Sequence, residues 1–167
     1  MTTATRIDRG STDTTAIYTE GTDLVFERTF DAPREQVWMA LTDPELVPRW
    51  WGPHGTTTTI VEMDVRPGGR WRYRNSASDR GDVVFFGEYL SVDPPTEYRW
   101  TFNFELDGSE VEGGPETYRF GEAYGRTTVT AIGHMGSPEN IDDVLATGMV
   151  AGAIETWDRL EALLTEL

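Results

Sequence analysis

One short stretch of this sequence concentrates the side chains best able to bind or to react. Residues 49–55 read Arg-Trp-Trp-Gly-Pro-His-Gly, so two indoles, a turn and an imidazole follow one another. Each indole has a large apolar surface and one N–H group that needs an acceptor. Neighbouring residues cannot easily face one core, so we expect Trp50 or Trp51 to line a pocket. In the alternative interpretation, Trp50 anchors a short helix and Trp51 packs under a sheet.

Two further residues of this sequence are catalytic candidates. His54 has an ordinary pKa of about 6.5 and could serve as a general base or a polar anchor, or it could simply be exposed. Glu88 lies between Phe86 and Leu90 in the alternation of a predicted strand. If it faces the interior, desolvation raises its pKa and suits it to acid chemistry; if it faces water, it has no special role. No nucleophile with an adjacent base is visible, and we expect a structural role for His134.

Composition excludes several classes of function. The 29 acidic and 14 basic residues give a formal net charge of −15, which repels phosphate backbones and anionic lipid surfaces. We therefore expect no nucleic-acid partner, and no run approaches the ~18 apolar residues that a membrane span requires. Cysteine is absent and the two histidines are far apart, so we expect neither a disulfide nor a metal site. We also expect no cofactor and, without an apolar leader, a cytoplasmic location.

The elements that must position these residues begin after a polar segment. Residues 1–22 are rich in Thr and lack a sustained period, which predicts a disordered leader before a single domain over 23–167. A first strand is predicted over 23–30. Asp31 then has the side chain of a helix cap, and the predicted helix reaches Leu41. A second short helix is expected to end near Trp50.

A series of strands is predicted for the middle of the chain. Arg70–Arg74 alternates Arg with aromatic residues, and residues 97–105 carry a row of Tyr98, Trp100, Phe102 and Phe104 on one face. This alternation is typical of half-buried strands, and the short connections favour antiparallel hairpins. The predicted strands are 56–65, 70–74, 82–92, 97–105, 116–121 and 126–134. The acidic, Gly-rich stretch 106–115 is expected to be a loop.

The C-terminal segment predicts one long helix. From Ile141 to Leu164 the apolar residues recur at helical spacing over about two dozen positions. Gly148 and Gly152 interrupt this stripe, and each costs about 1 kcal/mol against Ala in a helix interior. We therefore expect close packing or space for a ligand beside them. The predicted fold is α+β, with a curved antiparallel sheet of about six to seven strands wrapped around this helix.

Several motifs occur in the order that one protein family shows. Over residues 23–166, the sequence resembles the activator-of-Hsp90-ATPase-homologue-1-like branch of the START/Bet v 1-like (SRPBCC) superfamily. The motifs that carry the resemblance are Phe30-Asp31-Ala32-Pro33 before Val37-Trp38, Thr42-Asp43-Pro44-Glu45 before Trp50-Trp51-Gly52-Pro53, Asp64-Val65-Arg66-Pro67-Gly68-Gly69, Gly87-Glu88-Tyr89 before Asp93-Pro94-Pro95, and Gly148-Met149 before Gly152 and Leu160.

The resemblance implies a helix-grip fold with a deep, mostly apolar cavity between the sheet and the long helix. Related proteins bind lipids, polyketides, hormones and other hydrophobic molecules, and some act as cyclases or hydrolases. The branch is named after a eukaryotic co-chaperone domain. Many relatives have an aromatic residue after the helix glycine, whereas this sequence has Ala153.

Three functions follow as hypotheses. The first is binding of a hydrophobic small molecule in an internal cavity, the second is a cyclase- or hydrolase-type reaction in that cavity, and the third is a protein-interaction module by analogy with the co-chaperone. A homodimer is also plausible. The predicted ligand-binding residues are Trp50, Trp51, His54, Trp71, Tyr73, Phe86, Glu88, Trp100, Phe102, Tyr118, Phe120, Met149 and Gly152.

Overall fold

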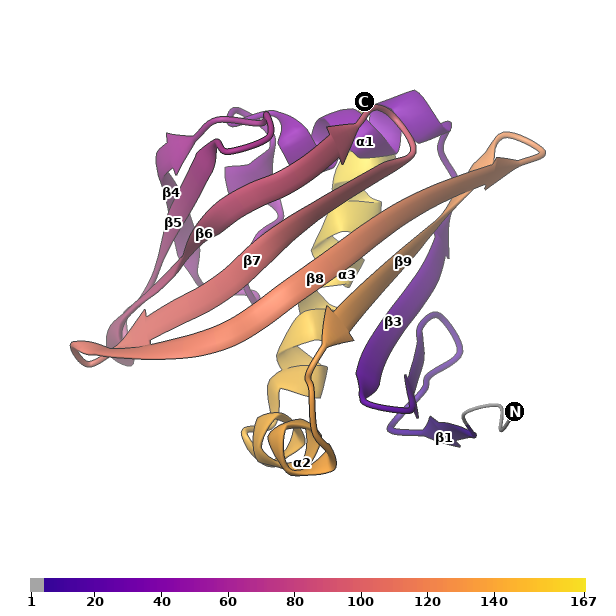
Figure 1. Cartoon of the computed structure of the whole chain (residues 1–167). Coiled ribbons are helices and arrows are strands. Elements are labelled where there is room, and N and C mark those ends of the chain that lie inside the picture. The colour runs from indigo at the N-terminus through magenta and orange to yellow at the C-terminus, as the bar shows by residue number, and fades with distance from the viewer. Residues whose placement is uncertain (1–4) are drawn as a thin grey trace.

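A nine-stranded antiparallel sheet, curved around the C-terminal helix, forms the frame of this protein (Figure 1). The computed structural model describes residues 5–167. The strands are β1 (Arg6–Asp8), β2 (Ala16–Glu20), β3 (Asp23–Phe30), β4 (Thr57–Met63), β5 (Arg70–Ala77), β6 (Arg80–Asp93), β7 (Glu97–Leu106), β8 (Ser109–Ala123) and β9 (Arg126–His134). The helices are α1 (Arg34–Thr42), the 3-10 helix η1 (Val47–Arg49), α2 (Pro138–Ala146) and α3 (Met149–Leu164).

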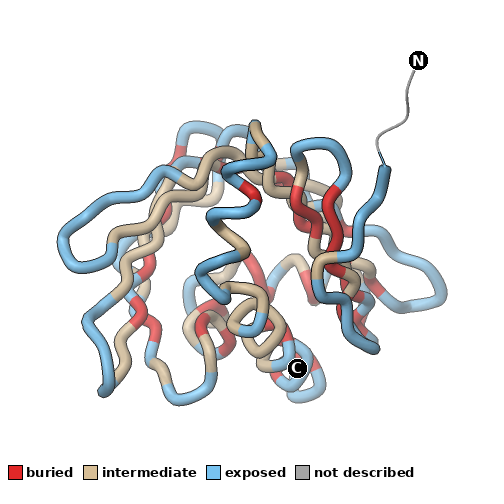
Figure 2. The backbone as a smooth tube through the Cα atoms, turned by 90° about the horizontal axis from the view of Figure 1, so that it is seen from below, coloured by how far each residue is buried: buried red, intermediate tan, exposed pale blue. Residues whose placement is uncertain are grey.

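The order of the strands across the sheet is β1-β2-β3-β9-β8-β7-β6-β5-β4. From β4 to β9 each strand pairs with the next one along the chain, as short hairpin connections require. The pairing of β3 with β9 brings the first half of the chain beside its end. Seen from below, the strands form an arch around the helices (Figure 2). The predicted α+β helix-grip fold is confirmed.

The sheet has nine strands rather than six or seven because part of the expected leader is folded. Ala16–Glu20 pairs with β3, and Ile17 lies opposite Phe26 with none of its surface exposed. On the other face, the Arg6 guanidinium lies 3.9 Å from the centre of the Tyr18 ring. Ile17 and Tyr18 therefore pack β2 against its neighbours. The many threonines around these two residues made the segment look like a polar leader in the sequence. Residues 1–4 of the expected leader lie outside the described residues.

The start of α1 differs from the expected cap. Pro33 is the N-cap residue, and Asp31 makes no capping hydrogen bond. Instead, the Arg34 backbone N–H donates to Glu122 Oε2 over 2.7 Å. A carboxylate at a helix N-terminus also complements the positive end of the helix dipole. The cap therefore comes from β8, 88 residues away along the chain.

The expected loop over 106–115 is mostly strand. β7 continues to Leu106 and β8 begins at Ser109, so the turn consists of Asp107 and Gly108. Both turn residues have a positive φ, 53° and 78°. Asp-Gly is a preferred pair for the type I′ turn, whose twist matches that of the flanking strands. The local turn chemistry therefore outweighs the acidic composition that suggested a loop.

The expected long C-terminal helix is broken in two. α2 ends at Ala146, and α3 starts after Gly148, whose φ of 77° lies in the left-handed region. Glycine reaches this region without the strain that a Cβ atom brings. Gly148 thus changes the direction of the chain, so that of α2 and α3 only α3 runs along the concave side of the sheet (Figure 1).

Candidate ligand-binding site

Six aromatic side chains from four adjacent strands line the concave face of the sheet and are called the aromatic wall below. They are Trp71, Tyr73, Phe85, Trp100, Phe102 and Tyr118. The strand register aligns them, since Tyr73 lies opposite Phe85 and alternate residues share a face. The alternation in β5 and β7 placed Trp71, Tyr73, Trp100 and Phe102 on one face, and their role in binding stays a prediction. Trp71, Tyr73 and Trp100 are each 1% exposed, whereas the other three are only partly buried.

A pair of stacked indoles forms the centre of the wall. The rings of Trp71 and Trp100 are 3.9 Å apart at an interplanar angle of 14°. The Trp71 Nε1–H donates to the backbone carbonyl of Thr101 over 3.1 Å. Gly87 leaves room for this bond, because a Cβ there would lie 1.9 Å from the Thr101 oxygen and 2.8 Å from Trp71 Nε1. A glycine inside a strand often marks such a close approach of two backbones.

The two tryptophans of the 49–55 stretch have different surroundings. Trp50 is 3% exposed, and its indole N–H donates to the Ala40 carbonyl over 2.8 Å, which ties the stretch to α1. Trp51 is partly buried and packs edge-on against the aromatic wall, with ring centres 4.9 Å from Tyr73 and 5.6 Å from Phe85. Of the pair, only Trp51 lies against the wall with part of its surface exposed.

Helix α3 fixes the position of this stretch through two polar side chains. The Arg159 guanidinium donates to the carbonyl of Gly52 over 2.8 Å and also reaches the carbonyls of Arg49, Trp51 and Pro53. Glu155 Oε1 accepts the backbone N–H of His54 over 2.6 Å. The stretch is therefore a structural joint between η1 and α3, and it places Trp51 against the wall.

Both catalytic candidates from the sequence lie away from the aromatic wall. The His54 side chain is exposed beside α3, and Glu88 is exposed on the opposite, convex face of the sheet. Phe86 shares that convex face, where the Arg72 guanidinium lies 5.2 Å from the centre of its ring. Because the Phe85 ring is part of the wall on the concave face, strand alternation places residues 86 and 88 on the convex face. Phe86 and Glu88 therefore lie outside the concave face, and the ligand contacts expected of them stay predictions.

Sequence reasoning missed the carboxylate that does face the wall. Glu116 in β8 lies opposite Trp100, and its Oε1 accepts the Trp100 indole N–H over 2.8 Å. Burial raises the pKa of Glu116 to about 7, and the Trp100 hydrogen bond opposes this shift. The signal was present in the sequence, because Glu116 precedes Tyr118 by two residues in one predicted strand. The two side chains must therefore share a face.

The tyrosines around Glu116 are neutral near physiological pH. Burial raises the pKa of Tyr98 and Tyr118 well above the usual value, and the negative charge of Glu116 acts in the same direction. Burial likewise raises the pKa of Tyr73. The rings of Tyr98 and Tyr118 are stacked 4.9 Å apart, and Trp100 lies 5.6 Å from Tyr118. Glu116 therefore lies among aromatic side chains, and among the described residues no ion pair includes it.

The remaining candidates have mainly structural surroundings. Phe120 is 2% exposed and packs 5.2 Å from the Trp38 ring of α1. Met149 starts α3, and a Cβ at Gly152 would lie 3.9 Å from Pro53 Cγ, an ordinary contact. His134 joins three strands, with Nδ1 3.0 Å from Asp23 Oδ1 and Nε2 3.0 Å from Thr117 Oγ1. The contacts of His134 therefore favour the structural role that we expected.

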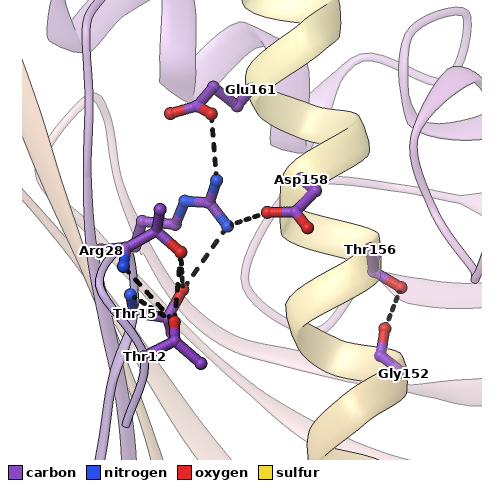
Figure 3. Close-up of polar contacts among 8 residues, drawn as sticks. Thr12, Thr15, Arg28, Gly152, Thr156, Asp158 and Glu161 are labelled. Carbon is purple, nitrogen blue, oxygen red and sulfur yellow. Dashed lines mark hydrogen bonds and ion pairs between the residues drawn. The ribbon is translucent and has the colours of Figure 1, made fainter.

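A buried cation joins the C-terminal half of α3 to the sheet (Figure 3). Arg28 of β3 is 2% exposed, and its guanidinium pairs with Asp158 at 2.7 Å and Glu161 at 3.1 Å. It also lies within 3.4 Å of the Thr15 hydroxyl in the segment before β2, while its Nε has no partner among the described residues. We call these three charged residues the Arg28 clamp. The clamp fixes one end of the helix over the concave face.

Two surface pockets lie away from the aromatic wall. One, of about 470 Å³, is lined by residues 11–16 together with Arg28 and Glu161, and the other, of about 620 Å³, lies beside residues 121–124. The predicted apolar cavity between sheet and helix therefore stays a prediction. Within residues 5–167, no three His, Asp or Glu side chains converge on a potential metal site. No helix in this part of the chain is long and apolar enough to cross a membrane.

A family comparison accounts for this combination of curved sheet and C-terminal helix. Residues 31–165 match the family model described as activator of Hsp90 ATPase homolog 1-like protein. The chain belongs to this family. The resemblance drawn from the motifs is thereby confirmed, and the fold of the family is a ligand-binding fold in general.

Several solved protein structures are similar to this one over most of the chain. Protein Ms6760 from Mycobacterium smegmatis is 30% identical with a TM-score of 0.78, and the alignment covers 87% of this chain and 92% of that one. A protein from Rhodobacter sphaeroides is 27% identical with a TM-score of 0.82, at 93% and 100% coverage. An AHSA1 protein from Silicibacter pomeroyi, 21% identical with a TM-score of 0.68 at 86% and 97% coverage, is alike in fold alone. No curated protein matches the chain.

Proposed function

We propose that this protein binds an apolar small molecule, aromatic or lipid-like, against the aromatic wall on the side that faces α3. The observation that carries the proposal is the uneven burial of the wall. Trp71 and Trp100 are 1% exposed, whereas Phe85, Phe102 and Tyr118 keep part of their surface exposed on the concave face. Covering apolar surface is favourable by about 25 cal/mol per Å². A ligand that covers these rings would supply the burial that the fold leaves incomplete.

The first half of α3 is the part of the helix that we expect to move for ligand entry. Among the described residues, the ion pairs between α3 and the sheet come from Asp158 and Glu161, both in its second half. The first half follows the left-handed Gly148, and the apolar Met149 and Ile154 are only partly buried there. Among the described residues, its one polar side-chain contact with another element is that of Glu155 with the His54 backbone N–H, and segments with few fixed contacts open at low free energy. A ligand would therefore enter between α2, the first turns of α3 and the wall.

Two phenylalanines provide a matched test of the binding surface. Phe102 belongs to the aromatic wall on the concave face, whereas Phe86 lies on the convex face. Both side chains are partly buried, and they lie on adjacent strands. We expect members of a panel of fatty acids, alcohols, amines and polycyclic aromatics to raise the unfolding temperature of the native protein. Phe102→Ala should weaken binding of the same molecules by tenfold or more, while Phe86→Ala should leave it unchanged. Absence of any stabilising molecule, or equal weakening by both variants, contradicts the proposal.

Glu116 favours an acid/base reaction as a second candidate function. A carboxyl with a pKa of about 7 can both give and take a proton near neutrality, as general acids and bases must. A cyclase- or hydrolase-type reaction on the bound molecule would then lose most of its rate in Glu116→Gln while binding persists. Chromatographic detection of product from a bound ester or polyketide-like aromatic tests this. The co-chaperone-like and homodimer hypotheses stay predictions.

A further inference from the structure

Glu116 is a carboxylate that the fold leaves without a positive partner. It lies in the middle of β8, opposite Trp100 on one neighbouring strand and Gly133 on the other. Its Oε1 accepts the Trp100 indole N–H, and within residues 5–167 no hydrogen bond reaches Oε2 and no ion pair includes the side chain. The Glu116 side chain is partly buried, and withdrawing a charge even partly from water without a partner is costly. A residue that served only to accept the indole N–H would not need this charge.

Aromatic side chains lie on the same face of the sheet as the carboxylate, and the Trp100 ring meets it through its N–H edge. The Trp100 ring lies 3.9 Å from Trp71 and 5.6 Å from Tyr118, and Tyr118 is stacked on Tyr98 at 4.9 Å. The faces of such rings attract an ammonium group, most strongly when water is excluded. A carboxylate set among Trp and Tyr rings therefore has the chemistry that recognises a protonated nitrogen with an apolar substituent.

The other charges of the protein agree with a cationic ligand. The Arg28 guanidinium, on the concave face of the sheet, already forms ion pairs with Asp158 and Glu161. It is therefore not free to bind an anion beside the wall. The whole chain carries 29 acidic and 14 basic residues, and such an excess raises the local concentration of cations and lowers that of anions. The acidic excess would thus attract a protonated amine to the protein, and the Glu116 carboxylate would form an ion pair with it.

We propose that the ligand of the aromatic wall is an apolar molecule that carries a protonated amine, with the Glu116 carboxylate as its counter-ion. The proposal rests on the proposed binding function and adds the chemical class of the ligand. The apolar body lies against the exposed parts of Phe85 and Phe102, and its ammonium group donates to Glu116 Oε2. The neutral tyrosines of the wall contribute ring faces and no competing charge.

Matched probes separate this proposal from binding in general. Octylamine, octanol and octanoate share one chain, while 2-naphthylmethylamine, 2-naphthylmethanol and 2-naphthoate share one ring system. Their dissociation constants are measured by calorimetry at pH 8, where Glu116 is mainly ionised because its pKa is about 7. For the native protein we expect each amine to bind at least tenfold more tightly than its alcohol, and each carboxylate to bind most weakly.

Two isosteric variants locate the cause of the preference. Glu116→Gln keeps an oxygen for the Trp100 N–H and removes the charge, whereas Glu88→Gln removes the same charge from the exposed convex face. The amine-to-alcohol ratio should fall to near one in Glu116→Gln and stay unchanged in Glu88→Gln. A ratio that survives in Glu116→Gln would arise from the general acidic surface and overturn the proposal.

A second measurement needs no variant and covers the case in which Glu116→Gln does not fold. The amine preference of the native protein should fall as pH drops from 8 to 5, because Glu116 becomes protonated. Tyr73 and Tyr118 of the wall, and Tyr89 and Tyr98 packed beside it, have raised pKa values and stay neutral across this range. A constant preference overturns the ligand class. If the alcohols bind as tightly as the amines, binding stands and the amine is wrong; if no probe binds, the proposed function itself fails.

Discussion

At the scale of the residue, Gly87 is the position on which the stacked indoles depend. The Thr101 carbonyl lies where a Cβ of residue 87 would be, and the Trp71 N–H donates to that same carbonyl. Any side chain at Gly87 would push these two groups apart. The indole of Trp71 would then lose its acceptor in a place where water cannot replace it.

We expect Gly87→Ala to destabilise the protein by about 2–4 kcal/mol, since it both overpacks the wall and leaves the Trp71 N–H unpaired. The matched control is Gly121→Ala, because a Cβ at Gly121 in β8 would meet nothing within 4 Å. Urea unfolding followed by tryptophan fluorescence measures both. A Gly87→Ala variant as stable as Gly121→Ala would show that the sheet relaxes around the new methyl group.

Glu116 gives a pH dependence with a defined sign. Its pKa is raised from 4.5 to about 7 in the folded protein, so between these pH values the folded state binds more protons than the unfolded state. Its contribution is complete below about pH 4.5 and is lost as pH rises to about 7, by up to about 3 kcal/mol. The free energy of unfolding of Glu116→Gln minus that of the native protein should therefore grow with pH in this window. Parallel pH profiles of the two proteins would contradict the raised pKa.

Individual residues of the site were predictable where alternation decides their direction. Trp71, Tyr73, Trp100 and Phe102 follow from the period of two in β5 and β7, and Glu116 could have been found by the same count. The different surroundings of Trp50 and Trp51 could not, because they depend on the Ala40 carbonyl and on Arg159. Ala40 is 10 residues away from Trp50, and Arg159 is 108 residues away from Trp51.

At the scale of the element, α3 is held at one end and less constrained at the other. The Arg28 clamp ties its second half to β3, and Arg159 ties the same half to the carbonyls around Gly52. Before its first turn, Gly148 breaks the helix with a positive φ. The apolar stripe predicted one continuous helix because periodicity does not reveal the backbone angle of a single glycine.

We expect the double variant Asp158→Asn/Glu161→Gln to lose about 3–5 kcal/mol, because it leaves the guanidinium of Arg28 buried without a charge partner. The control Asp142→Asn/Asp143→Asn makes the same change in net charge at two exposed positions of α2. Thermal and urea unfolding compare the two double variants. Equal stabilities would mean that water or Thr15 compensates Arg28 fully.

At the scale of the whole molecule, the acidic excess opposes the compact state. The chain has a net charge of −15, and in the β7–β8 hairpin Glu105 lies directly opposite Glu110. Like charges in facing positions of a sheet repel each other. The sheet therefore carries a destabilising electrostatic contribution that does not depend on the aromatic wall.

We expect added NaCl to raise the unfolding temperature by several degrees as it screens this repulsion over a Debye length of ~10 Å at 0.1 M and less above it. Glu110→Gln should be more stable than the native protein at low salt and gain less from added NaCl. Scanning calorimetry at increasing salt, with choline chloride as a second salt, measures the effect. An unfolding temperature that falls on addition of either salt would mean that attractive ion pairs such as the Arg28 clamp dominate.

The stacked pair Trp71–Trp100 also makes the wall optically distinctive. Two indoles 3.9 Å apart and nearly parallel share their electronic excitation, so their near-ultraviolet transitions mix and lend rotational strength to each other. Circular dichroism in that region therefore reports the geometry of this pair most strongly, with a further contribution from Trp51, whose ring centre lies 6.1 Å from Trp71 and 6.3 Å from Trp100. Any molecule that reaches the wall and separates or tilts the Trp71 and Trp100 rings would change the near-ultraviolet circular dichroism spectrum, so its binding could be detected without a label.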